Sequence, residues 1–102
     1  MDSSREVWLK VFKKNEEVVT RQIAGEAILV PIRGKLADIQ KIFALNPVAE
    51  YIWQQLDRDR NLGEIRDGIL ANFQVEQEEA EADLQEFIIE LLEADLIVGG
   101  TQ

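Results

Sequence analysis

The stretch FALNPVAEYIWQQLDRDRNLGEIRDGIL, residues 43–70, decides how the chain is interpreted, because the period of its apolar residues changes at Asn46. The segments before this point are rich in β-branched and apolar side chains, as strands are, whereas the apolar side chains after Pro47 recur at helical spacing. Asn caps the exposed N–H groups at a helix start, and Pro is well tolerated at the first helical position. The sequence therefore predicts strands up to residue 45 and helices from residue 46 onward.

Two short helices are predicted within this stretch. The first runs to about Leu56, and a charged break at 57–60 follows it. Asn61 and Glu64 then have the spacing of a capping box, which starts a second helix of roughly ten residues. The buried stripe of the first helix is predicted to be Val48, Ala49, Ile52, Trp53 and Leu56. That of the second is predicted to be Ile65, Ile69, Leu70 and Phe73.

A longer third helix is predicted over about residues 77–94. Its apolar side consists of Ala80, Leu84, Phe87, Ile88, Leu91 and Leu92. The many Glu residues of 76–93 are interpreted as a solvated face, or alternatively as a surface that docks a basic patch on a partner enzyme. A short apolar tail at 96–98 is expected to pack back onto the helices before Gly99 and Gly100.

The residues before Asn46 predict a three-stranded sheet. Segments 18–23 and 26–32 are rich in β-branched side chains, and the two residues between them, Ala24 and Gly25, suit a hairpin turn. Segment 40–45 is a plausible third strand. The predicted fold class is α+β and winged-helix-like, with an N-terminal three-stranded antiparallel sheet packed on three helices. The domain is expected at 18–98, after a partly ordered extension (1–17) and before a disordered tail (99–102).

The composition indicates one compact domain without the usual parts of an enzyme. The chain has 102 residues, 46% apolar and 30% charged, and it contains neither Cys nor His. Thiolate nucleophiles, the usual zinc ligands and the commonest general base are therefore missing. Asp57, Asp59 and Asp67 lack the Gly and terminal Glu of a calcium loop. We predict no catalytic residue, no metal and no cofactor.

Membrane and nucleic-acid functions are disfavoured by the distribution of apolar and charged residues. The sequence has no apolar run near the roughly 20 residues of a membrane span and no secretory signal, so a cytoplasmic location is expected. Residues 1–45 carry eight Lys/Arg and six Asp/Glu, whereas residues 46–102 carry three and fourteen. Helices this acidic repel phosphates. A winged-helix transcriptional regulator is therefore the weaker alternative, and no nucleic-acid partner is predicted.

An ordered set of residues resembles the PqqD-like family, whose members are also called RiPP recognition elements. The set is Leu45-Asn46-x-x-Ala49-x-x-Ile52-Trp53-x-x-Leu56-Asp57, Leu62-x-Glu64-Ile65, Phe73-x-Val75, Phe87-x-x-x-Leu91 and Leu96-Ile97. With the strands that precede Leu45, the resemblance covers about residues 18–98. The chain departs from the family pattern at Arg58, where Gly is frequent, and at Leu62, where Ser or Thr is frequent.

The resemblance implies a binding function. In this family the leader of a ribosomally made precursor peptide adds as an extra strand to the open edge of the third strand, beside the long helix. The domain is then a non-catalytic chaperone that presents the peptide to a modifying enzyme, in much of the family a radical SAM protein, for PQQ biosynthesis or another peptide pathway. The implied edge residues are Gln40, Lys41, Ile42, Phe43, Ala44 and Leu45. The implied groove floor is Phe43 with Leu84, Phe87, Ile88 and Leu91.

Several alternatives stay open from the residues alone. Phe87, Ile88 and Leu91 serve either the core alone or the core and the groove together. Lys41 is either an edge charge that blocks aggregation or a contact to an acidic leader side chain. An open strand edge can also pair with its own copy, so both a monomer and a homodimer are compatible with the sequence. Another kind of protein-interaction module is the remaining functional alternative.

Overall fold

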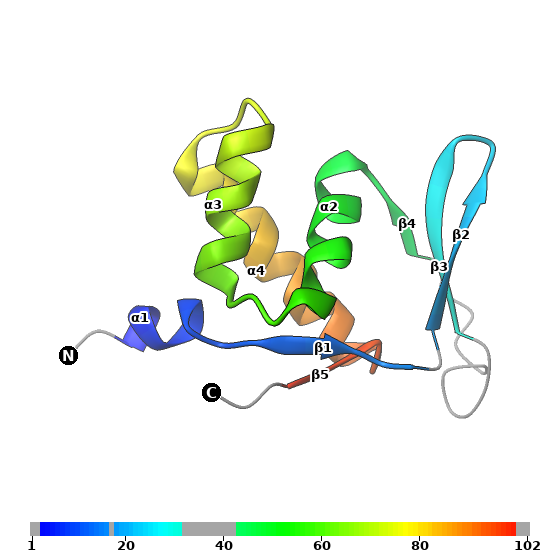
Figure 1. Cartoon of the computed structure of the whole chain (residues 1–102), viewed down its shortest axis with the longest axis horizontal. Helices are drawn as coiled ribbons and strands as arrows, with labels where there is room; N and C mark the ends of the chain where they lie inside the picture. Colours follow the sequence, from blue (N-terminus) through cyan, green and yellow to red (C-terminus); the bar gives the residue numbers. More distant parts are fainter. Residues whose placement is uncertain (1–2, 17, 32–42, 100–102) are drawn as a thin grey trace.

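The structure is a computed structural model, and it describes residues 3–16, 18–31 and 43–99. The elements in chain order are α1 (Ser3–Trp8), β1 (Phe12–Lys14), β2 (Val18–Ile23), β3 (Glu26–Pro31), β4 (Phe43–Leu45), α2 (Pro47–Gln55), the 3-10 helix η2 (Leu56–Arg58), α3 (Leu62–Asn72), α4 (Gln77–Glu93) and β5 (Ile97–Gly99). The β2–β3 hairpin extends to one side of the helices α2, α3 and α4, and β1 and β5 run below them (Figure 1). The predicted α+β fold class is confirmed.

The predicted three-stranded antiparallel sheet is present, and its strand order is β2-β3-β4. Ala24 and Gly25 form its hairpin turn with φ of 54° and 84°, the left-handed values that a type I′ turn requires. The turn places Ile23 opposite Glu26. The predicted third strand is described at Phe43–Leu45, because residues 40–42 lie outside the described part of the chain.

The ladder determines which peptide groups of β4 point to the sheet edge. Residues that flank a two-residue turn exchange both hydrogen bonds, and antiparallel pairs alternate from there. In the pair Ile23 and Glu26 the peptide groups point toward each other, so the peptide groups of Ala27 and Leu29 point the other way, toward β4. There Ala27 faces Leu45, and Leu29 faces Phe43. Ala44, between these two, therefore directs its N–H and C=O away from β3. No other described strand pairs with β4 on that side.

The helix starts follow the predicted capping signals. Asn46 Oδ1 accepts the Ala49 N–H at 2.8 Å, and Pro47 opens α2. At α3, Asn61 Oδ1 accepts the Glu64 N–H at 2.7 Å, while Glu64 Oε1 accepts the Asn61 N–H at 2.9 Å. This reciprocal pair is the capping box that the sequence predicts. Both caps fix where the chain leaves β4 and turns into the helices.

The turn after α2 explains one departure from the family pattern. The residue with the left-handed backbone is Asp59, with φ 56° and ψ 34°, and not Arg58, which ends η2. Asp tolerates this conformation better than most residues because its short polar side chain can hydrogen-bond locally. The absence of Gly at residue 58 therefore leaves the turn intact.

Trp53 joins α2 to the sheet, in the core position that its place on the helix predicts. Its side chain is buried, and its indole N–H donates to Thr20 Oγ1 of β2 at 3.0 Å. The Lys14 ammonium lies 4.9 Å from the ring centroid. The other large buried side chains of the described core are Phe12, Leu29, Phe43, Leu45, Ile52, Leu56, Leu62, Ile65, Ile69, Leu84, Ile88, Leu91, Leu96 and Ile97.

An antiparallel ribbon that the sequence did not predict joins the two ends of the described chain. β1 pairs with β5, with Phe12 opposite Gly99 and Lys14 opposite Ile97. The Asn15 N–H donates to the Leu96 carbonyl at 2.9 Å, and Phe12 is buried in the core. The expected extension (1–17) thus contributes α1 and β1, and the expected apolar tail contributes β5.

Within the described residues, no helix is long and apolar enough to cross a bilayer.

Candidate functional site

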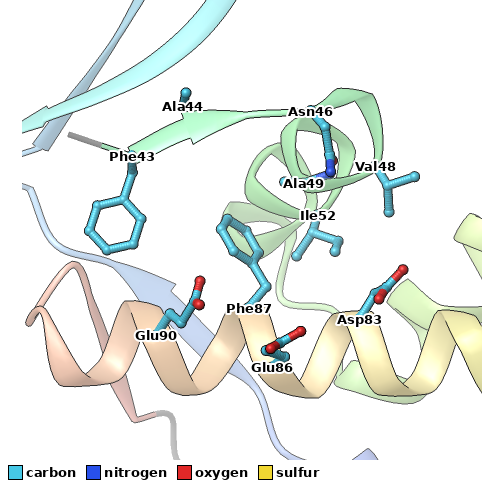
Figure 2. A pocket seen from close by; sticks show the side chains of 10 residues that line it. All are labelled: Phe43, Ala44, Asn46, Val48, Ala49, Ile52, Asp83, Glu86, Phe87 and Glu90. Atoms are coloured by element: carbon cyan, nitrogen blue, oxygen red, sulfur yellow. The ribbon is translucent and has the colours of Figure 1, made fainter. Parts of the chain in front are cut away.

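An open hollow of about 240 Å³ lies between β4, the start of α2 and one side of α4. Figure 2 shows β4 passing above α4, with side chains of both elements directed into the space between them. The hollow, called the β4–α4 groove from here on, is lined by Phe43, Ala44, Asn46, Val48, Ala49, Ile52, Asp83, Glu86, Phe87 and Glu90. The Asn46 cap places the first turn of α2 at one end of this groove.

Two phenylalanines form the apolar part of the groove. Phe87 projects from α4 toward β4, and Phe43 projects from β4 toward α4 (Figure 2). Phe43 is buried, whereas Phe87 is only half-buried, because it lies at the border between the core side and the exposed side of α4. Val48, Ala49 and Ile52 of α2 complete the apolar wall. The groove can therefore take an apolar side chain against Phe87.

The α4 wall of the groove ends in a row of carboxylates, the acidic rim (Asp83, Glu86 and Glu90). With Phe87, these residues have the spacing of one helix face, and all three are exposed. The described ion pairs involve other acids, such as Lys14 with Asp57 at 3.4 Å and Arg66 with Glu81 at 3.0 Å. Among the described residues, no ion pair neutralises a carboxylate of the acidic rim.

The predicted site residues fall into three groups. Phe43, Ala44 and Phe87 line the groove. Leu45, Leu84 and Leu91 are buried in the core and do not line it. Ile88 is also buried and borders a second hollow, on another side of α4, which Val7, Phe12 and Leu62 help to line. The remaining three, Gln40, Lys41 and Ile42, lie outside the described residues.

Sequence reasoning missed the α2 wall and the acidic rim. The rim had a signal, since positions 83, 86, 87 and 90 recur at helical spacing around the predicted groove residue Phe87. The α2 wall had none, because the packing of α2 and not its periodicity decides that Val48 and Ala49 face the groove. The completed site offers an apolar floor, a carboxylate wall and a strand edge with Ala44 peptide groups directed outward, which together suit an extended peptide.

Comparison with known proteins places the chain in a family. The chain belongs to the family described as Coenzyme PQQ synthesis protein D (PqqD), which matches residues 26–97. The match extends from β3 to β5 and so includes every element that lines the groove. The resemblance seen in the sequence is confirmed. No curated protein sequence matches the chain significantly.

Two solved structures share the fold. One is TbiB1 in complex with the TbiA(beta) leader peptide, with 28% sequence identity, a TM-score of 0.68, and coverage of 88% of this chain and 99% of that chain. The other is lasso peptide synthetase B1 complexed with the leader peptide, with 20% identity, a TM-score of 0.69, and coverage of 85% and 96%. The second likeness concerns the fold alone. Both of these similar proteins were solved with a leader peptide bound.

Proposed function

We propose that this protein is a non-catalytic chaperone that captures the leader of a ribosomally made precursor peptide and presents it to a modifying enzyme. The observation that carries the proposal is the outward-facing peptide group of Ala44 at the sheet edge, directly beside the β4–α4 groove. The similarity to TbiB1, which was solved with the TbiA(beta) leader peptide, supports it.

The binding step follows from the physics of an added strand. The leader backbone accepts the Ala44 N–H and donates to the Ala44 carbonyl, and side chains on one side of the leader enter the groove. There an apolar side chain packs against Phe87 and Phe43. Main-chain hydrogen bonds supply affinity for any extended segment, while the groove determines register and selects the sequence.

The modification itself is assigned to a partner enzyme. The resemblance to the family implies a radical SAM protein as this partner, and the cytoplasm expected from the sequence is the proposed location of both. Co-expression of the tagged chain with a radical SAM enzyme encoded beside it tests the partner. The expected result is co-purification that salt weakens, because an acidic chain of net charge −9 associates through a basic patch. Failure of the two proteins to associate, with or without the precursor, contradicts this assignment.

Peptide binding is tested by titration of the ¹⁵N-labelled chain with a synthetic leader of a precursor encoded beside it. Shift changes are expected at Phe43–Leu45 and at Phe87. Ala44→Pro removes the outward N–H and should weaken binding at least about tenfold, while the helices stay folded. Gln22→Pro is the matched control, since the same alternation directs the Gln22 N–H to the outer edge of β2. Equal affinities of the two variants would contradict strand addition at β4.

A further inference from the structure

We propose that the β4–α4 groove selects leaders that carry Lys or Arg two positions from an apolar residue. The inference rests on the proposed function and specifies the peptide that it takes. It is carried by the position of the acidic rim, which forms the α4 wall of the groove beside the apolar contact at Phe87.

Strand geometry determines which leader residues meet the rim. The leader residue opposite Ala44 shares the side of the sheet on which Ala44 lies, so its two neighbours point the other way, as Phe43 and Leu45 do. Ala44 is exposed whereas Phe43 and Leu45 are buried, which identifies the side that faces α4. Two leader side chains, separated by one residue, therefore enter the groove.

The spacing of these two side chains is close to the spacing between Phe87 and the carboxylates of the rim. Same-side residues of a strand are about 6.7 Å apart, given a rise of roughly 3.3 Å per residue. Phe87 is separated from Asp83 by one helical turn, or about 6 Å of axial rise, and from Glu90 by three residues, or about 4.5 Å. One side chain can thus fill the space at Phe87 while the other reaches a rim carboxylate. The long apolar stems of Lys and Arg suit this position, because they can cover the Phe87 ring while the charge meets the rim.

The negative charge of α4 determines that the groove prefers basic leader side chains to acidic ones. Residues 77–93 contain seven acidic residues and neither Lys nor Arg. The described cation nearest in the sequence, Arg66, pairs with Glu81, and no ion pair of the described residues involves Asp83, Glu86 or Glu90. A leader with Asp or Glu in the groove would meet like charge, whereas a leader with Lys or Arg would meet carboxylates that no described residue pairs with.

A charge-reversal experiment tests the preference. The full chain is used to select binders from a display library of random twelve-residue peptides, and the selection is repeated with the double variant Glu86→Lys, Glu90→Lys. The control is Glu79→Lys, Glu93→Lys, which makes the same change in net charge at exposed α4 positions that do not line the groove. Each selected peptide is then titrated against the wild-type chain, both double variants and Ala44→Pro.

The expected result is enrichment of Lys or Arg two positions from an apolar residue. Reversal at Glu86 and Glu90 should weaken these peptides at least about tenfold and shift the selection toward Asp and Glu, while the control changes affinity only a few-fold. The charge preference is overturned if the selected peptides require the Ala44 edge but show no enrichment of Lys or Arg, or if the two double variants weaken their binding equally. The proposed function then still stands. If no peptide is selected, or if Ala44→Pro leaves binding unchanged, the proposed function itself is overturned.

Discussion

The core side and the groove side of α4 differ in what their residues do. The core side consists of Ala80, Leu84, Ile88 and Leu91, all buried. The groove side consists of Asp83, Glu86, Phe87 and Glu90, of which only Phe87 is half-buried. One helix therefore stabilises the domain with one set of residues and forms the wall of the groove with another. The comparison teaches that stability and peptide affinity should respond to different substitutions.

The largest expected loss of stability is at Trp53, a buried core residue of α2. Trp53→Ala removes a buried ring together with its hydrogen bond to Thr20, and should lower the free energy of unfolding by about 3–5 kcal/mol. Chemical denaturation monitored by circular dichroism measures this change. A shift in melting temperature too small to resolve would contradict a core role for the ring.

Leu84→Ala is the corresponding test on the core side of α4. Leu84 is completely buried, so its truncation should cost about 2–5 kcal/mol of stability through lost apolar contact and a residual cavity. Affinity for a leader peptide, measured at a temperature where the variant is fully folded, should change little. A large loss of affinity with unchanged stability would mean that the two sides of the helix are not separate in function.

Phe87→Ala tests the groove side of the same helix. Loss of the half-buried ring should weaken leader binding by more than about 1 kcal/mol, because the peptide loses its apolar contact. Its cost in stability should be smaller than that of Leu84→Ala. Calorimetric titration and thermal unfolding are measured on the same sample. A lower melting temperature with unchanged leader affinity would assign Phe87 to the core alone.

A smaller effect is expected where Trp53 meets the sheet. Thr20→Val removes the acceptor of the indole N–H and should cost about 1 kcal/mol of stability, the lower end of the cost of an unsatisfied buried donor. Thr20→Ser keeps the hydroxyl and is the matched control. The two variants are compared by urea denaturation. Equal stabilities would show that water replaces this hydrogen bond without cost.

The smallest effect is expected at Lys13, which does not line the groove. Its hydrogen bond to Asp59, with the attraction of the same carboxylate, raises the pKa of Lys13 above the ordinary value of 10.5. Because the pKa is raised in the folded state, the stabilisation is present below pH 10.5 and is lost as the pH rises through the folded-state value. Asp59→Asn should return the Lys13 pKa toward 10.5 in an NMR titration. An unchanged pKa would contradict the pairing, and leader affinity should stay the same in either case.

The elements that the sequence predicted are those with local signals. Asn46 with Pro47, the Asn61 and Glu64 capping box, and the Ala24-Gly25 turn each specify a structure within a few residues, and all three occur as predicted. β1 and β5 escaped prediction because each has only three residues. Their stability comes from pairing with one another across almost the whole described chain, which no short window of sequence records.

The site was harder to predict than the fold. Periodicity identifies an apolar stripe on α4, but the rotation of α4 against β4 decides which part of the stripe borders the groove. The structure puts Leu84 and Leu91 inside and leaves Phe87 at the border. It also places Asp83, Glu86 and Glu90 in the wall of the groove, which the helix face they share with Phe87 could have indicated.

The pairing of β1 with β5 has a consequence for the order in which the chain folds. The helices α2, α3 and α4 lie between these two strands in the sequence, so they can assemble from neighbouring segments before the ribbon closes. The pairing of β1 has to wait for β5, and contacts between distant segments form slowly because a long loop must first be closed. During synthesis, the groove should therefore take shape before the ribbon completes the domain.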